Sequence, residues 1–334
     1  MIFSPGVTPV LSPLASNAPR SPRPIDVSVL VPAKDEAENL PLFMEQAAAA
    51  FEASPFSYEV VVIDDGSIDA TPAVLETLIK QYSFLRVVRH RSRRGIAEAL
   101  RTGYLAARGG VLVFYPADLQ FKPEDIPRLV APILAGESDM VTGFKEGKYD
   151  KAFVSGIYNG LSRALFHVPV KDLNSVKAYR REIMDALPVR PDWHRYMVVI
   201  AAAQGFTVTE VPVPLYPRHA GKSKFATWHR IPIGVLDMLS VWFELRISQK
   251  PLLLFGVLGA GLFAISTIAG IVALVFNRSL AVRPLWTLIQ TCLILGSIFF
   301  ATGLLGEQVA GQRAQLREIR RQLDELGADR IKDR

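Results

Sequence analysis

Two long runs in the last third of the chain contain no charged residue, and they constrain the fold more than any other feature. Residues 251–276 form a run of 26 and residues 284–306 a run of 23. As helices rising about 1.5 Å per residue, both are long enough to cross a hydrocarbon core about 30 Å thick. Each run is apolar on all faces, whereas a core helix of a soluble protein is amphipathic. The sequence therefore predicts two membrane-spanning helices.

The link between these runs is short, so the two spans are expected to form a hairpin whose outer ends lie on one side of the membrane. Lys and Arg concentrate outside the link: Arg230, Arg246, Lys250, Arg313, Arg317, Arg320 and Arg321. Because cytoplasmic flanks carry an excess of basic residues, the N-terminal region and the tail are predicted to be cytoplasmic. The net charge of +6 suits contact with anionic lipid and anionic substrates. We expect an integral protein of the inner or plasma membrane.

The region before the spans alternates apolar strands with helices. Strands are expected at 26–32, 58–64, 85–89 and 111–115, and helices at 39–53, 71–82 and 96–107. Near-continuous apolar strands in βα alternation indicate an α/β fold with a mostly parallel, Rossmann-like sheet covered on both faces. Later strands are expected at 138–144 and 174–179. A further strand at 206–215 carries two prolines, which suit a sheet edge.

These patterns divide the chain into five parts. Residues 1–24 are rich in Pro, Ser and Ala and are predicted to be a disordered leader. Residues 25–224 form the α/β domain, and 225–250 mix Trp with basic residues, as interfacial helices do. Residues 251–306 hold the two spans, and 307–334 form a C-terminal helix. The single cysteine, Cys292, lies in the second span and excludes an internal disulfide.

Polar clusters follow three of the expected parallel strands. They begin at Val31-Pro-Ala-Lys-Asp-Glu, at Asp64-Asp65-Gly-Ser and at Tyr115-Pro-Ala-Asp-Leu-Gln. Any one of them alone could be a helix cap. Three at successive strand ends indicate a ligand site, because ligands bind at the carboxyl ends of parallel strands.

At this spacing the three clusters resemble the inverting GT-A glycosyltransferases of family 2. The chain looks most like the dolichyl-phosphate mannose synthase and polyprenyl-phosphate glycosyltransferase branch. Residues 171–181, KDLNSVKAYRR, are similar to the branch pattern D-x-N-x-x-F-K-x-F-R-R. Residues 210–213, EVPV, and 217–224, PRHAGKSK, are similar to its E-V-P-V and R-x-x-G-x-S-K stretches. The resemblance runs from about Val27 to the end of the second span.

The resemblance implies an inverting transfer of a hexose-type sugar from a UDP- or GDP-linked donor to polyprenyl phosphate on the cytoplasmic leaflet. It also implies residue roles. The nucleotide-sugar would contact Pro32, Lys34, Glu36, Asp64, Asp65, Gly66, Ser67, Arg94, Gly95, Ala117 and Asp118. The lipid phosphate would contact Lys145, Lys151, Ser155, Arg180, Arg181, Arg218, Lys222 and Lys224. Asp118 and Asp172 are the candidate catalytic residues, although Asp172 could equally cap a helix.

The resemblance further implies a divalent cation. Mg²⁺ or Mn²⁺ would be held by Asp118 and Gln120, and would stabilise the charge of the departing diphosphate. However, Pro116 stands where the family has the first Asp of its D-x-D-x-Q motif, and proline cannot ligate a metal. The alternatives are therefore a metal site completed by phosphate oxygens and water, a weaker metal dependence, or an inactive homologue.

Three other functions are possible for a chain of this pattern. A processive polysaccharide synthase would carry a Q-x-x-R-W motif and more spans, and Asp192–Arg195 is not that motif. A catalytically silent membrane scaffold is the second alternative, with Pro116 as the lesion. A nucleotide-binding dehydrogenase would show G-x-G-x-x-G after the first strand, and this chain does not. The expected partners are the donor, the lipid phosphate, the membrane and a second copy of the chain, with no nucleic acid.

Overall fold

The computed structural model describes residues 25–146, 160, 165–166, 168, 170–173, 175–186, 193–220, 230–248, 250–275 and 282–332. The chain divides into two units, Met1–Met238 and Leu239–Arg334. The first unit contains the sheet, and the second contains the two longest helices.

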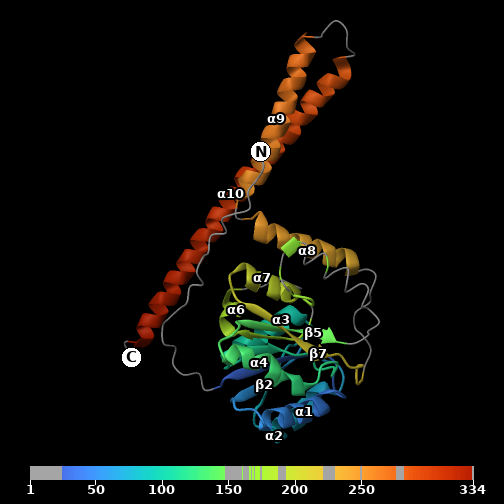
Figure 1. Ribbon diagram of the computed structural model, residues 1–334, viewed down its shortest axis with the longest axis vertical. Helices are drawn as coiled ribbons and strands as arrows, with labels where there is room; N and C mark the ends of the chain where they lie inside the picture. Colours follow the sequence, from blue (N-terminus) through green and yellow to red (C-terminus); the bar gives the residue numbers. More distant parts are fainter. Residues whose placement is uncertain are drawn as a thin grey trace. The chain divides into compact units, whose positions relative to one another are not determined.

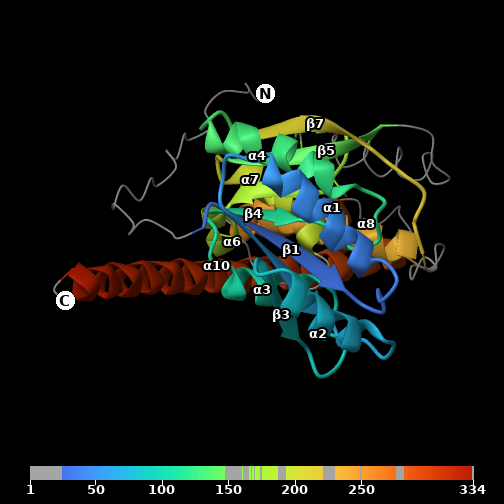
Figure 2. The same ribbon diagram turned by 90° about the horizontal axis from the view of Figure 1, so that it is seen from below.

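Seven strands form one mixed sheet in the order β3-β2-β1-β4-β6-β5-β7 (Figures 1 and 2). Their bounds are β1 Val27–Ala33, β2 Tyr58–Asp64, β3 Leu85–Arg89, β4 Val111–Phe114, β5 Met140–Glu146, β6 Lys177–Arg180 and β7 Val208–Pro214. The pairs β1–β2, β2–β3, β1–β4 and β5–β7 are parallel, while β6 runs antiparallel to both β4 and β5. The predicted mostly parallel α/β fold is confirmed, and so is the placement of the proline-containing strand at an edge.

Side chains of β1, an interior strand of the sheet, alternate between two helix layers. Val27, Val29 and Val31 belong to a core cluster shared with α1 (Leu40–Glu52) and α4 (Ile126–Leu134). The opposite face meets α3 (Ile96–Ala106) so closely that a Cβ on Gly103 would lie 2.8 Å from Ile63 Cδ1. Because both faces are buried, these strands are apolar at nearly every position. Figure 1 shows α1 and α2 (Thr71–Gln81) below the sheet and α3 above it.

The first unit also contains several short helices. They are η1 (Pro123–Asp125), α6 (Arg181–Ala186), η2 (Trp193–Tyr196) and α7 (Met197–Ala203). The η2 turn contacts α3, and α7 contacts β5 and β7. Tyr196 is fully buried, and its hydroxyl donates a hydrogen bond of 3.1 Å to the carbonyl of Gly234 in α8 (Arg230–Arg246). These contacts hold η2 over the face of the sheet that α3 covers.

The second unit is dominated by α9 (Pro251–Val275) and the 51-residue α10 (Val282–Lys332), packed as a pair. Glycines allow this close packing: a Cβ on Gly259 would lie 2.9 Å from Gly296 O. Ser266 Oγ also donates to Ile289 O across the pair at 3.3 Å. Helix α10 continues through residue 306, where the sequence predicted a boundary between span and tail. Within the predicted interfacial region 225–250, the structure describes one helix, α8.

Both long helices expose large apolar side chains on their outer faces. Leu253, Val257 and Ile268 are each more than 60% exposed, and Leu305 is 64% exposed. Only 22% of the most apolar stretch of either helix is buried, whereas a core helix of a soluble protein is mostly buried. Both are long and apolar enough to cross a bilayer, and this pattern indicates membrane association.

Candidate active site

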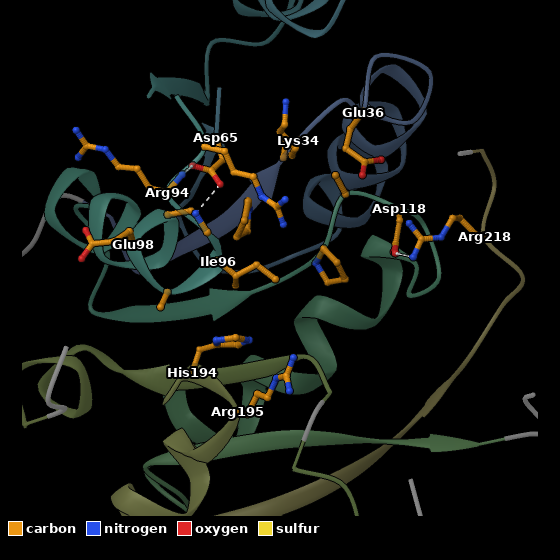
Figure 3. A pocket seen from close by; sticks show the side chains of 18 residues that line it. Lys34, Glu36, Asp65, Arg94, Ile96, Glu98, Asp118, His194, Arg195 and Arg218 are labelled. Carbon is orange, nitrogen blue, oxygen red and sulfur yellow. Dashed lines mark hydrogen bonds and ion pairs between the residues drawn. The ribbon is translucent and has the colours of Figure 1, made fainter. Parts of the chain in front are cut away.

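A cavity of about 350 Å³ opens at the carboxyl ends of β1, β2 and β4 (Figure 3). Many residues that the sequence singled out for the nucleotide-sugar line it: Pro32, Lys34, Glu36, Asp65, Arg94, Gly95, Ala117 and Asp118. They come from the carboxyl ends of β1, β2, β3 and β4, which the parallel pairing brings to one edge of the sheet. Arg218, expected at the lipid phosphate, lines the same cavity.

Asp65, after β2, organises the start of α3. Its Oδ1 accepts hydrogen bonds from the Arg94 amide at 2.7 Å and from His90 Nδ1 at 2.8 Å, and its Oδ2 accepts one from the Gly95 amide at 2.8 Å. Burial raises the pKa of this carboxyl, but the hydrogen bonds and charge of His90 and the two amides outweigh it, and the net pKa is lowered. His90 is itself held by Thr102 at 2.9 Å. Asp65 therefore stays ionised and fixes the loop that lines the cavity.

Asp64, Gly66 and Ser67 shape the neighbouring turn and lie outside the cavity lining. Asp64 is fully buried; its Oδ1 accepts from the Ser67 amide at 2.8 Å, and its Oδ2 pairs with Arg89 Nε at 3.1 Å. Ser67 Oγ accepts from the Asp35 amide, and Gly66 O accepts from Lys34 Nζ at 2.7 Å. Gly66 has φ +69°, which favours glycine. These residues tie the loops after β1 and β2 together.

The loop after β4 carries Asp118, which is 8% exposed. Arg218 Nη2 lies 2.9 Å from Asp118 Oδ2 and donates to Gln120 Oε1 at 3.3 Å, so one nitrogen contacts both predicted metal ligands. The other carboxylate oxygen, Asp118 Oδ1, accepts a hydrogen bond from the backbone amide of Gln120 at 3.2 Å. Burial raises the pKa of Asp118, and the nearby Glu36 charge adds to this, while Arg218 and the Gln120 amide oppose it. The net effect is a raised pKa.

The predicted lipid-phosphate cations are not gathered at one place. Lys145 Nζ pairs with Asp172 Oδ2 at 3.1 Å, and both side chains lie outside the cavity lining. Arg218 is at the cavity. Lys151, Ser155, Lys222 and Lys224 lie outside the described residues.

Arg180 and Arg181, predicted for the lipid phosphate, lie at the far end of the sheet from the cavity. Strand β6 is antiparallel to β4, and its register places Arg180 opposite Val111, the first residue of β4, whereas the cavity follows the last one. Arg180 pairs with Asp139 at 3.0 Å. The Arg181 guanidinium donates to the carbonyls of Tyr104 and Ala107 at 2.9 Å, at the C-terminal end of α3. The structure therefore separates these two arginines from the other predicted site residues.

The antiparallel strand instead brings Lys177 to the cavity end of β4, opposite Phe114. This lysine is 1% exposed and donates to Ser175 O at 2.8 Å. Burial lowers its pKa to about 7; Asp172 opposes that shift and Lys145 adds to it. The sequence contained Lys177 within a quoted motif, but its pattern assigned the residue no role.

His194 and Arg195 on η2 also line the cavity, and sequence reasoning missed both (Figure 3). Burial lowers the pKa of His194 to about 3, and the charges of Arg195 and Lys177 add to this, so the ring is neutral near pH 7. Among the described residues, His194 Nδ1 and Arg195 Nε are buried without a hydrogen-bond partner. Neither residue follows a strand, so the strand-end pattern offered no signal for them.

Comparisons with known proteins cover most of the chain. A family model described as glycosyl transferase family 2 matches residues 28–166. The chain is 28% identical over 299 residues to the dodecaprenyl-phosphate galacturonate synthase of Rhizobium johnstonii, which covers 86% of this chain and 88% of that protein. It is 28% identical over 308 residues to the undecaprenyl-phosphate 4-deoxy-4-formamido-L-arabinose transferase of Pseudomonas fluorescens, which covers 89% and 88%.

Solved structures match the sheet-containing part. The glucosyl-3-phosphoglycerate synthase from Mycobacterium tuberculosis in complex with Mg²⁺ and UDP gives a TM-score of 0.53 at 21% identity, covering 65% of this chain and 80% of that one. The same enzyme in complex with Mn²⁺, UDP and phosphoglyceric acid gives a TM-score of 0.52 at 21% identity, and the match covers 64% of this chain and 78% of that one. At this identity the likeness shows the fold alone, which is of the GT-A type.

Proposed function

Because the chain is a glycosyltransferase of family 2, we propose that it transfers a sugar from a nucleotide-sugar to polyprenyl phosphate. One observation carries the proposal: loops from four strand ends line a charged cavity in a chain similar to two polyprenyl-phosphate transferases along nearly its whole length. The two apolar helices are consistent with an acceptor that resides in a membrane.

The cavity is suited to an anionic donor. Five cationic side chains line it, against four carboxylates: Lys34, Arg93, Arg94, Arg195 and Arg218 face Glu36, Asp65, Glu98 and Asp118. The first turn of α3 also contributes to the lining, and the amino end of a helix favours negative charge. We propose that base and ribose lie along the loops after β1 and β2, with the diphosphate between Arg94 and Arg218.

The reaction is a single in-line displacement. An oxygen of the lipid phosphate attacks the anomeric carbon, the bond from that carbon to the diphosphate breaks, and its electron pair leaves with the nucleoside diphosphate. The configuration at the anomeric carbon inverts. The acceptor phosphate is already anionic at neutral pH, so it needs orientation and charge neutralisation more than a base. The Lys145–Asp172 pair supports a positioning role for Asp172 rather than proton transfer.

The proposal does not specify which sugar the donor carries. A hexose is the expectation from the sequence, but the relatives' names include a galacturonate and a formamido-arabinose. We further propose that the active site faces the cytoplasmic leaflet and that the helical hairpin associates with copies of itself. A native mass spectrum showing only monomers would count against this association.

The sequence resemblance implies Mg²⁺ or Mn²⁺ as a cofactor. Structural relatives bind these ions together with UDP. In this chain the two predicted ligands, Asp118 and Gln120, already contact Arg218, and Pro116 lines the cavity beside them. These residues fit a metal poorly, so no step of the proposed reaction passes through one.

A donor panel tests the proposed function. The full chain in detergent is incubated with undecaprenyl phosphate and each of a set of UDP- and GDP-sugars, and the lipid fraction is analysed by mass spectrometry. The expected result is one product whose mass is that of the lipid phosphate plus one sugar residue. If no donor yields a glycolipid while the protein remains folded, a silent scaffold becomes the better account.

A further inference from the structure

The two residues expected to bind a metal are instead joined by an arginine. Arg218 Nη2 lies 2.9 Å from Asp118 Oδ2 and 3.3 Å from Gln120 Oε1, which is the position that a shared cation would take. Neighbouring backbone supports this arrangement, because the Tyr216 amide donates to the Gln120 carbonyl at 2.9 Å. The segment after β7 is thereby held against the loop after β4.

The surrounding groups do not make a divalent-cation site. Among the residues that the structure describes, no group of three or more His, Cys, Asp or Glu side chains is placed to hold a metal. Glu36 is the other carboxylate close enough to influence Asp118, but its Oε2 accepts a hydrogen bond of 2.6 Å from Asn39 Nδ2. A guanidinium is charged at every accessible pH, and it would repel a divalent cation bound to the same oxygens.

The charges in this loop balance without a metal. In the motif that the chain resembles, two carboxylates accompany one divalent cation. Here the first carboxylate is replaced by the neutral Pro116, and a single positive guanidinium accompanies the remaining Asp118. The Asp118–Arg218 pair is therefore neutral before the donor binds, without a metal.

Resting on the proposed function, we propose that Arg218, held by Asp118 and Gln120, neutralises the donor diphosphate in place of a divalent cation. Its side chain is 21% exposed and lines the cavity. Guanidinium has five N–H donors, and within the described part of the chain the contacts to Asp118 and Gln120 engage only Nη2, so the N–H groups of Nη1 and Nε can donate to phosphate oxygens. Arg195 lines the same cavity, so a second guanidinium lies near the proposed diphosphate position.

Calorimetric titration of nucleoside diphosphate into the full chain tests this inference. UDP and GDP are titrated separately into protein in detergent, once with excess EDTA and once with millimolar MgCl₂. We expect the Kd of the preferred nucleotide to differ by less than about threefold between the two conditions. Binding that tightens with MgCl₂ by about tenfold or more would overturn the inference. A tenfold lower Kd corresponds to about 1.4 kcal/mol of binding free energy, which the cation would then supply.

Variants of Arg218 give an independent readout. Arg218→Gln is expected to weaken binding in EDTA by at least about tenfold, since it removes a charge-assisted contact. Arg218→Lys should recover only part of the loss, because lysine lacks the planar fork. Arg180→Gln is the matched control: it breaks an arginine–aspartate pair at the far end of the sheet and should leave the Kd unchanged. Unchanged binding by a folded Arg218→Gln protein would overturn the inference.

The outcomes separate the inference from the proposed function. Nucleotide binding that requires Mg²⁺ contradicts the role of Arg218 but leaves the transferase proposal standing. Failure of both UDP and GDP to bind under both conditions contradicts the two together. The wild-type comparison needs no variant, so it remains decisive even if Arg218→Gln fails to fold.

Discussion

At the scale of single residues, each of three aspartates at the strand ends is held by its own hydrogen bonds or ion pair. Asp64, Asp65 and Asp118 all follow apolar strands in the sequence, yet they have different roles in the structure. Asp64 is buried beneath a turn, Asp65 holds the start of α3, and Asp118 pairs with Arg218. Their positions at strand ends were predictable from the sequence. Their roles were not, because His90, Arg94 and Arg218 reach them from distant parts of the chain.

The Asp65 arrangement predicts a specific loss of donor binding. Asp65→Asn keeps the size of the side chain but replaces one of the two acceptor oxygens with a donor, leaving a buried amide of Arg94 or Gly95 poorly paired at a cost of about 1–3 kcal/mol. We expect nucleotide affinity to fall by about tenfold or more by calorimetry. Asp69→Asn is the control, because this carboxylate also accepts from two backbone amides, those of Thr71 and Ala37, but lies outside the cavity lining. Equal affinity for the two variants would contradict this role.

Lys177 predicts how stability depends on pH. Its pKa is about 7 in the folded chain but about 10.4 when unfolded. Between these values the unfolded state binds a proton that the folded state has released, so the free energy of unfolding rises with pH; below about pH 7 the full cost of the buried ammonium is present. Thermal unfolding from pH 6.5 to 9 should show this rise in wild type and in Lys80→Met, an exposed lysine. Lys177→Met should lose it, and an unchanged slope would refute the assignment.

At the scale of elements, one strand direction explains most of what the sequence reading misplaced. The expected strand near 174–179 was found as β6, but its apolar residues carry no sign of whether it runs parallel or antiparallel. Because β6 is antiparallel, it takes Arg180 and Arg181 away from the cavity and brings Lys177 toward it. A local run of apolar residues predicts that a strand exists. Whether that strand runs parallel or antiparallel to its neighbours depends on the long segment that connects them, and local patterns do not encode that path.

The turn after β2 predicts a difference between two glycines. Gly66 and Gly136 both have positive φ, +69° and +78°, so alanine at either position costs about 1–2 kcal/mol in backbone strain. A Cβ on Gly66 would also lie 2.7 Å from the carbonyl carbon of Ser92, whereas nothing lies within 4 Å at Gly136. Gly66→Ala should therefore lower the Tm more than Gly136→Ala, and only Gly66→Ala should weaken nucleotide binding, because Arg93 and Arg94 line the cavity. Equal shifts would contradict the described turn.

The α9–α10 pair predicts a second matched comparison. A Cβ on Gly259 would lie 2.9 Å from Gly296 O, while at Gly261 nothing lies within 4 Å. Gly259→Leu should force the helices apart, and Gly261→Leu should be tolerated. In heated detergent samples analysed by size-exclusion chromatography, the monodisperse peak of Gly259→Leu should disappear at a lower temperature. Similar behaviour of the two variants would show that the helices do not pack through Gly259.

At the scale of the whole molecule, sequence and structure agree on a sheet-containing unit and a unit of two long apolar helices. Hydropathy alone was sufficient for the helices, because lack of charge over 26 and 23 residues leaves few other environments. The cavity was predictable in outline from three strand-end motifs. The contributions of His194, Arg195 and Lys177 were not, because they depend on how η2 and β6 pack.

The central claim is that the acceptor is a lipid phosphate, and an acceptor exchange tests it most directly. With the donor found in the panel, the full chain is offered undecaprenyl phosphate or undecaprenol, which is the same chain without the phosphate, and both nucleoside diphosphate release and glycolipid mass are measured. We predict release and a glycosyl phosphate lipid only with undecaprenyl phosphate. Equal transfer to undecaprenol, or release that is unaffected by either lipid, would contradict the account.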